Sequence, residues 1–328
     1  MTRRIVSFVS IALLVVALAP AAAAAQDDEQ IQIGFLPGVI DPFYQVMELG
    51  VNAAIADAGL ADPITQVPDQ WGPTIQTPIL DALVARGDID CLITAPTDKE
   101  QMITPLQFAV DAGISVVTVD TFLGDGDYVN GEVTFPISYI GSDNVEGGRI
   151  AARALADSLG GEGTAYIQNT NEGVSTTEQR SEGFRAGIAE FPGIEIVGED
   201  YNLDDENTAV TQTSAKLLVE PDLGGIFGVN VFSAQGAGNA VINAGLGGVV
   251  DVIAFDATIR AIELMDEGVV SLIIAQKPFD MGYMGVQACL ADAGGVTSYP
   301  TRITTGYAVI TPDNVTDPEV ARFIYRVE

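Results

Sequence analysis

The chain has 328 residues, with 14 lysines and arginines against 45 aspartates and glutamates, two cysteines and no histidine. The absence of histidine excludes Ser-His-Asp and Cys-His catalysis and histidine-ligated zinc. The formal charge of -31 argues against a nucleic-acid partner, because nucleic-acid phosphates are bound through lysine and arginine. The length predicts about two domains of roughly 150 residues each.

The first 25 residues have the pattern of an export signal. Arg3 and Arg4 precede an apolar stretch at 5–18, and small residues run up to Ala25, where cleavage is predicted. The apolar stretch is shorter than the ~20 residues of a membrane-spanning helix, so cleavage is favoured over a membrane anchor. Because no cysteine lies near this point, a lipid anchor is not expected. The sequence therefore predicts an exported, periplasmic protein.

From residue 31 onward, short apolar runs alternate with amphipathic stretches. Strands are predicted at 31–36, 65–67, 91–94, 115–119, 164–168, 195–197, 225–229, 252–255 and 271–275. Helical patterns between them include 44–58, 146–159, 177–190, 207–219, 234–243 and 281–292. Several strands are apolar on consecutive residues, which is typical of a parallel sheet covered by helices on both faces. A Gly- and Asp-rich break at 121–139 divides the series, so we expect two doubly wound α/β lobes.

The sequence leaves open whether the two cysteines form a disulfide or remain free thiols. A bridge between Cys91 and Cys289 is conceivable in an exported protein. The favoured interpretation is two buried free thiols, because the sequence alone does not supply the geometry that a bridge needs.

Polar and aromatic side chains follow the predicted strands. In an open parallel sheet, ligands bind beyond the carboxyl ends of the strands. Carboxylates and carboxamides can pair with neighbouring sugar hydroxyls, and flat aromatic rings can cover the C–H faces of a sugar. The residues at these ends include Asp41, Phe43, Tyr44, Asp120, Asn230, Asp256 and Gln276. Trp71, after the second strand, is either a further wall of the pocket or a packing residue of the surface. The pattern indicates a site for a monosaccharide or polyol.

The order and spacing of these segments resemble the ribose-binding-like group of type I periplasmic binding proteins, the solute receptors of ABC sugar importers. The matching segments are Asp41-Pro42-Phe43-Tyr44, Ala95-Pro96-Thr97-Asp98, Val117-Thr118-Val119-Asp120, Ile140-Gly141-Ser142-Asp143, Glu178-Gln179-Arg180, Gly228-Val229-Asn230, Ala254-Phe255-Asp256 and Ile274-Ala275-Gln276.

The resemblance implies a ligand cleft between two lobes joined by a three-segment hinge. The crossings are expected near 139–142, 276–278 and 300–303. The N-terminal lobe would comprise 30–140 plus 277–302, and the C-terminal lobe 141–276 plus 303–328. The chain departs from the family pattern at Ala95, often Asn, and at Thr121, often Arg. These departures argue against ribose and keep other pentoses, hexoses and alditols open.

The resemblance also implies the ligand-binding residues, to which Trp71 is added from the sequence. They are Asp41, Phe43, Tyr44, Trp71, Asp120, Arg180, Asn230, Asp256 and Gln276. For Arg180 the structural alternative is a salt bridge to Glu178 or Glu182. The expected partners are a sugar or polyol and the transmembrane subunits of an ABC permease, with the receptor a monomer.

Other functions remain open at this point. A periplasmic sensor for chemotaxis or kinase signalling could use an identical cleft. A glycosidase would need two converging carboxylates with one held protonated, which the acids of this site could supply. No catalytic residue, cofactor or metal is predicted. The segment from Asp125 to Glu132 hints at a calcium loop, but Val129 occupies a liganding position, so an acidic loop is favoured.

Overall fold

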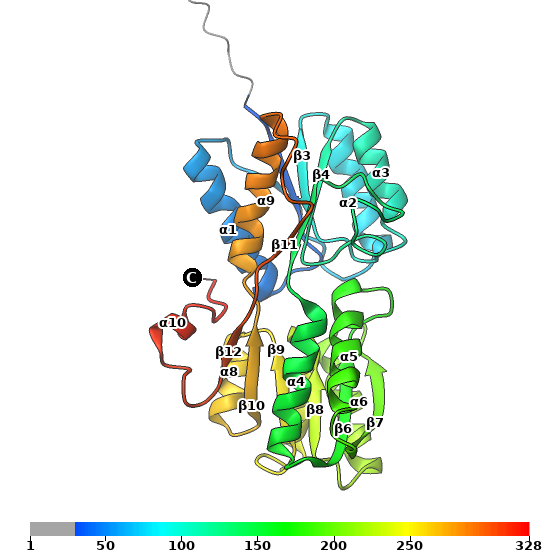
Figure 1. Cartoon of the computed structure of the whole chain (residues 1–328), viewed down its shortest axis with the longest axis vertical. Helices are drawn as coiled ribbons and strands as arrows, with labels where there is room; N and C mark the ends of the chain where they lie inside the picture. The colour runs from blue at the N-terminus through cyan, green and yellow to red at the C-terminus, as the bar shows by residue number, and fades with distance from the viewer. Residues whose placement is uncertain (1–29, 328) are drawn as a thin grey trace, which may run out of the picture. The chain divides into compact units, whose positions relative to one another are not determined.

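The computed structural model describes residues 30–327 (Figure 1). The predicted signal segment, 1–25, lies outside the described residues. Within 30–327 the strands form two six-stranded sheets. In spatial order the first sheet consists of β11 (Arg302–Thr304), β5 (Ser138–Gly141), β4 (Ser115–Val119), β3 (Cys91–Thr94), β1 (Ile33–Leu36) and β2 (Ile64–Thr65). The second consists of β12 (Ala308–Ile310), β10 (Val270–Ala275), β9 (Asp251–Phe255), β8 (Gly225–Gly228), β6 (Glu162–Asn169) and β7 (Gly193–Tyr201).

The helices fill the intervals between these strands and pack on the sheets. They are α1 (Pro42–Ala58), α2 (Pro73–Arg86), α3 (Ile103–Asp111), α4 (Asn144–Ser158), α5 (Ser175–Ile188), α6 (Glu206–Val219), α7 (Val231–Asn243), α8 (Ile259–Asp266), α9 (Pro278–Ala293) and α10 (Pro318–Ala321). In the described part of the chain, no helix has the length and apolarity needed to cross a membrane.

This architecture confirms the predicted two-lobed α/β fold. The central strands β1, β3 and β8 are buried along their whole length, which explains their consecutive apolar residues. One edge differs from the expected all-parallel arrangement, since β12 pairs antiparallel with β10. A strand that arrives directly from the neighbouring lobe needs no helical crossover, so it can pair in this direction.

Three segments join the two sheets. The chain leaves β5 of the first sheet for α4, and it returns from β10 of the second sheet into α9, which packs beside α1 (Figure 1). The third crossing was expected near 300–303. Residues Arg302–Thr304 still pair with β5, and the chain passes on to β12 a few residues later.

Helices α4 and α5 lie unusually close together because glycines face the contact. A Cβ atom at Gly148 would lie 2.1 Å from the carbonyl oxygen of Arg180, and one at Gly183 would lie 2.0 Å from that of Val145. Since no side chain fits at either position, the two backbones touch. This contact fixes the helix that carries Arg180.

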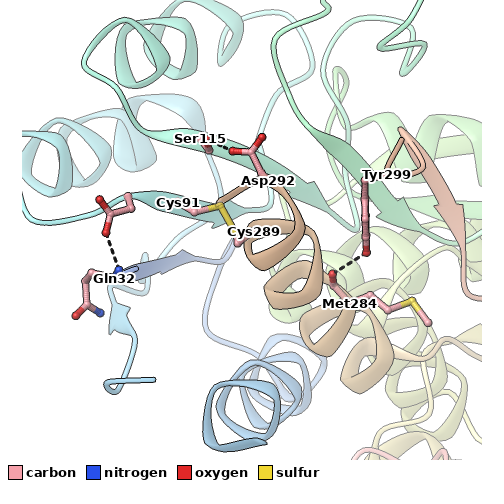
Figure 2. Close-up of a disulfide and its surroundings, with 8 residues drawn as sticks. Gln32, Cys91, Ser115, Met284, Cys289, Asp292 and Tyr299 are labelled. Carbon is pink, nitrogen blue, oxygen red and sulfur yellow. Dashed lines mark hydrogen bonds between the residues drawn. A yellow bond between two sulfur atoms is a disulfide. The ribbon is translucent and has the colours of Figure 1, made fainter. Parts of the chain in front are cut away.

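Cys91 and Cys289 form a disulfide (Figure 2). The interpretation as free thiols was therefore wrong. Cys289 lies on α9, which returns from the second sheet and packs against β3, so the two Cα atoms come within 5.8 Å of each other. Ser115 on β4 also donates a hydrogen bond to Asp292 of α9 (2.6 Å). The bridge thus attaches the returning helix to the first lobe across 198 residues of sequence.

Candidate functional site

The first lobe places its site residues at the start of α1 and at the end of β4. Asp41 is the N-cap of α1, and its side chain accepts a hydrogen bond from the Tyr44 backbone N–H (2.7 Å). Pro42 occupies the first turn, where its missing N–H costs nothing. The cap thereby fixes the first turn of the helix, and Phe43 and Tyr44 are buried beside the end of the sheet.

The second lobe repeats this arrangement. Asn230 follows β8 and caps α7 by accepting from the Ser233 N–H (3.0 Å). Asp256 follows β9, and Gln276 follows β10 at the hinge. Asp256 accepts a hydrogen bond from the Gln276 side chain (2.9 Å), and Gln276 accepts one from Ser142 (2.8 Å). Ser142 lies on the first crossing, so this chain of hydrogen bonds ties the site to two hinge segments.

Asp120 and Asp256 occupy equivalent places in the two lobes, and both have a left-handed backbone, with φ of 60° and 76°. A residue other than glycine in this region costs on the order of 1–3 kcal/mol, and such strain clusters at functional sites. The carboxyl groups of these two residues flank Arg180, one from each lobe. Each lies 4.0 Å from a guanidinium nitrogen.

The structure brings all nine predicted residues together around one cavity between the lobes. They are Asp41, Phe43, Tyr44, Trp71, Asp120, Arg180, Asn230, Asp256 and Gln276. Thr170, Thr177 and Asp204 also line the cavity and were not predicted. Contact of these side chains with a ligand stays a prediction.

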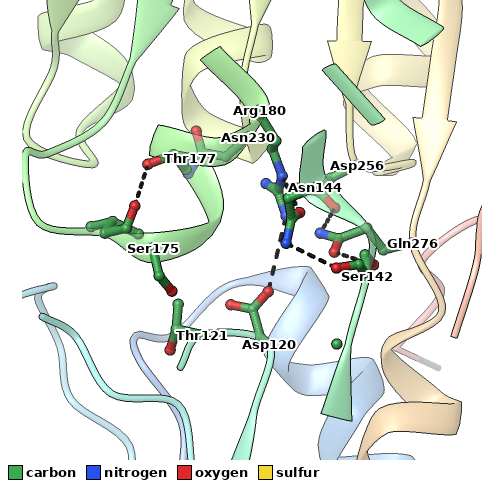
Figure 3. Close-up of polar contacts among 12 residues, drawn as sticks. Asp120, Thr121, Ser142, Asn144, Ser175, Thr177, Arg180, Asn230, Asp256 and Gln276 are labelled. Atoms are coloured by element: carbon green, nitrogen blue, oxygen red, sulfur yellow. Dashed lines mark hydrogen bonds and ion pairs between the residues drawn. The ribbon is translucent and has the colours of Figure 1, made fainter. Parts of the chain in front are cut away.

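Arg180 reaches from α5 toward the first lobe (Figure 3). Its Nε donates to Asn144 (2.8 Å) and its Nη1 to the Val229 carbonyl (2.9 Å), while the guanidinium lies 4.0 Å from the centre of the Phe255 ring. The Nη2 atom is buried and has no hydrogen-bond partner within the described protein. The alternative of a salt bridge to Glu178 or Glu182 does not hold, since Arg180 is 2 % exposed and Glu178 pairs with Lys99.

Aromatic rings form the wall beside Asp120. Tyr44 donates its hydroxyl to Asp120 (2.7 Å), and its ring stacks at 6.4 Å on Trp71. The Trp71 indole N–H donates to the Thr97 carbonyl (2.8 Å), which holds the ring in place. Trp71 lies in the wall of the cavity, and its contact with a ligand stays a prediction.

Burial raises the pKa of the carboxyl groups around the cavity. For Asp41 and Asp256 the main cause is loss of water, and the pKa of each lies above its ordinary value. Desolvation also raises the pKa of Asp120 to about 6, although Arg180 and the Tyr44 hydroxyl oppose the rise. The pKa of Asp120 thus lies closer to neutral pH than that of an exposed carboxyl group.

Asp204 is an acidic residue of the site that the sequence did not predict. Its carboxyl accepts a hydrogen bond from the Asn230 amide (2.7 Å), and burial raises its pKa to about 7. Leu203 and Asp204 both have positive φ, near 59° and 58°. The signal was available, because Asp204 follows β7 just as the other site residues follow their strands.

Beyond the cavity, the two lobes touch at a second place. Lys99 forms an ion pair with Glu178 of α5, and its backbone N–H donates to the Gly173 carbonyl (3.0 Å). The Phe122 N–H donates to the Ser175 hydroxyl (3.0 Å). These contacts hold the lobes together on the side of the cavity that carries no hinge segment.

In the acidic loop from Asp125 to Glu132, aspartate side chains accept hydrogen bonds from backbone N–H groups of the same loop. Asp127 accepts from the N–H groups of Val129 and Asn130, both at 3.0 Å, which lowers the pKa of its carboxyl. Among residues 30–327 there is no group of three or more Cys, Asp or Glu side chains arranged to hold a metal ion.

A family model described as a periplasmic binding protein domain matches residues 33–295. The chain belongs to this family. An ABC transporter solute-binding protein from Agrobacterium vitis, solved with α-D-tagatopyranose, is 45% identical with a TM-score of 0.88, covering 90% of this chain and 100% of that one. A second from the same species, solved with D-fucose, is 27% identical with a TM-score of 0.83, over 90% of this chain and 100% of the other. The D-ribose/D-allose-binding protein of Pseudomonas aeruginosa is 30% identical over 70% of this chain and 71% of its own length.

Proposed function

We propose that this protein is the exported solute receptor of an ABC importer and that it binds one monosaccharide or polyol between its lobes. The observation that carries the proposal is the cavity itself, in which a buried arginine from one lobe faces carboxyl groups from both. Its relatives are solute-binding proteins whose structures hold tagatose and fucose, and a sugar of this class is the ligand expected here.

The chemistry of the lining fits a sugar. Asp120 and Asp256 accept hydrogen bonds from ligand hydroxyl groups, one from each lobe. The Nη2 atom of Arg180, which has no partner in the described protein, donates to a ring or hydroxyl oxygen of the ligand. Phe43, Tyr44 and Trp71 provide apolar surface for the C–H faces. Because the ligand would contact both lobes, its binding favours the closed arrangement that a permease recognises.

Several finer points belong to the same proposal. The first lobe comprises 30–140 plus 277–304, two residues beyond the expected boundary because β11 pairs with β5, and the second lobe comprises 141–276 plus 305–328. The receptor acts as a periplasmic monomer after cleavage near Ala25. Its membrane partner is an ABC permease. A receptor that signals to a chemoreceptor or kinase would share the cleft, and co-purification with the permease subunits separates the two.

A thermal-shift screen tests ligand binding directly. The panel contains D-tagatose, D-fucose, D-arabinose, D-allose, D-ribose and common alditols. A ligand at 100 times its dissociation constant stabilises the folded form by about 2.7 kcal/mol, so a matching sugar raises the melting temperature by several degrees. A panel in which no compound moves the melting temperature would refute the sugar-receptor proposal.

A glycosidase is the second candidate, and the raised pKa of Asp120, about 6, is the observation that favours it. We propose that the protein is not an enzyme, because both candidate acids lie beside the same guanidinium and neither is placed as a lone protonated donor. Incubation with chromogenic glycosides decides the matter. Release of more product than there is protein would establish catalysis.

A further inference from the structure

The C-terminal segment after β12 returns to the ligand site. It passes through α10 and ends against the loop that follows β9. There the Tyr325 N–H donates to the Ala257 carbonyl (2.8 Å), and Tyr325 pairs with Thr258 in an isolated parallel bridge. Tyr325 is 2 % exposed although it lies near the end of the chain. This anchorage places the Tyr325 side chain directly behind Asp256.

The Tyr325 hydroxyl is part of the hydrogen-bond network of the site. It donates to Oδ1 of Asp256 (2.9 Å) and accepts from the Gln276 backbone N–H (3.1 Å). Oδ1 also accepts from the Gln276 amide (2.9 Å), while the other oxygen, Oδ2, lies 4.0 Å from Nη1 of Arg180. The ring of Tyr325 meets the ring of Phe43 edge-on, with centroids 5.9 Å apart. One residue of the tail therefore contacts side chains from both lobes.

We propose that Tyr325 is a positioning residue of the ligand site, which holds Asp256 in the orientation and the ionised state that accept a ligand hydroxyl. This inference rests on the proposed function. Tyr325 does not itself line the cavity, so it acts through Asp256. A charged acceptor binds a hydrogen-bond donor more strongly than a neutral one does, so the Tyr325 hydroxyl favours the carboxylate over the acid.

The groups around Asp256 show why its ionised form needs the hydrogen bond from Tyr325. Burial raises the pKa of Asp256, and the carboxyl groups of Asp41, Asp120 and Asp204 also face it across the cavity. The groups that stabilise its ionised form are the Arg180 guanidinium, the Gln276 amide, the Tyr325 hydroxyl and the Val231 backbone N–H. The remaining titratable neighbour is Tyr307, whose own pKa burial raises. Loss of the Tyr325 hydroxyl therefore raises the pKa of Asp256 further.

The variant Tyr325→Phe removes this hydroxyl and keeps the ring. Titration with D-tagatose between pH 5 and pH 8 measures the affinity of the parent and the variant. We expect affinity about tenfold weaker near pH 7, because a rise of about one unit in the pKa of Asp256 lowers its ionised population up to about tenfold. We also expect the decline of affinity on the acid side to begin at a higher pH than in the parent. A purely structural role would lower the melting temperature without moving this pH profile.

The matched control is Tyr128→Phe. Tyr128 is equally buried and its hydroxyl also makes two hydrogen bonds, to Thr118 and to the Leu123 N–H, but it lies away from the cavity. This variant should bind D-tagatose as the parent does. A Tyr325→Phe protein whose affinity matches the parent's at every pH overturns the inference.

A second readout separates this inference from the proposed function. If the parent binds no sugar of the panel, the proposed function fails, and ¹³C NMR of the aspartate carboxyl groups still measures the pKa of Asp256 without ligand. A rise of that pKa in Tyr325→Phe supports the positioning role. An unchanged pKa refutes it.

Discussion

Replacement of Arg180 by lysine removes the most specific donor of the cavity while keeping its charge. The guanidinium makes two buried hydrogen bonds, to Asn144 and to the Val229 carbonyl, and keeps Nη2 for a third partner. Lysine has one nitrogen at the end of a flexible chain, so it cannot satisfy three acceptors in these directions. The contact of the guanidinium plane with the Phe255 ring is lost as well.

Two magnitudes follow from these contacts. A hydrogen bond to a charged group contributes about 1.5–3 kcal/mol, so the loss of the ligand contact weakens affinity by about 10- to 150-fold. At least one of the two structural hydrogen bonds is lost too. The free energy of unfolding should therefore also fall, by about 1.5–3 kcal/mol.

Isothermal titration with D-tagatose measures the affinity, and urea unfolding measures the stability. Arg185→Lys is the control, because Arg185 lies on the same helix but pairs with Glu199 at the surface. It should change the affinity little, since exposed ion pairs contribute only ~0–1 kcal/mol. If the titration of Arg180→Lys overlays that of the parent, Arg180 is not a ligand-binding residue.

Three further perturbations test other parts of the structure. Replacing Cys91 and Cys289 together by alanine opens a loop of 198 residues and should lower the free energy of unfolding by about 5 kcal/mol in urea; a loss below about 1 kcal/mol would contradict the chain-entropy argument. The pKa of Asp204 rises from 3.8 to about 7, so the folded state holds a proton that the unfolded state has lost, and stability falls as pH rises between these values. Asp204→Asn should therefore raise the melting temperature more at pH 8 than at pH 4, and an equal change at both would refute this. Lys99→Met removes a partly exposed ion pair between the lobes and should weaken sugar affinity less than about fivefold. A larger loss would make the pair a main determinant of closure.

The strands in the middle of each sheet were predictable because they are buried on both faces. Two strands, Cys91–Thr94 and Ser115–Val119, begin and end where the apolar pattern placed them. The short crossing strands β11 and β12 are only partly buried and carry little pattern. Helix α2 has a proline inside it and few buried positions, which hides its amphipathic period.

The site was predictable as far as the strand-end rule was applied. The residues at strand ends meet at one cavity because the carboxyl ends of both sheets face it. Arg180, which lies within α5, was expected only from the family resemblance. Asp204 escaped because β7 is an edge strand with acidic residues near its end, so the apolar pattern stopped at Val197 while the strand continues to Tyr201. The disulfide and Tyr325 depend on contacts between distant segments, which no local pattern contains.

Isothermal titration of the parent protein with D-tagatose, D-fucose, D-arabinose, D-allose and D-ribose tests most directly whether the cavity is a sugar site. We predict saturable binding of one sugar molecule per chain for at least one of these compounds, with affinity about 10- to 150-fold weaker in Arg180→Lys. The absence of saturable binding for every sugar, in a sample that unfolds cooperatively on heating, would contradict the assignment of this protein as a sugar receptor.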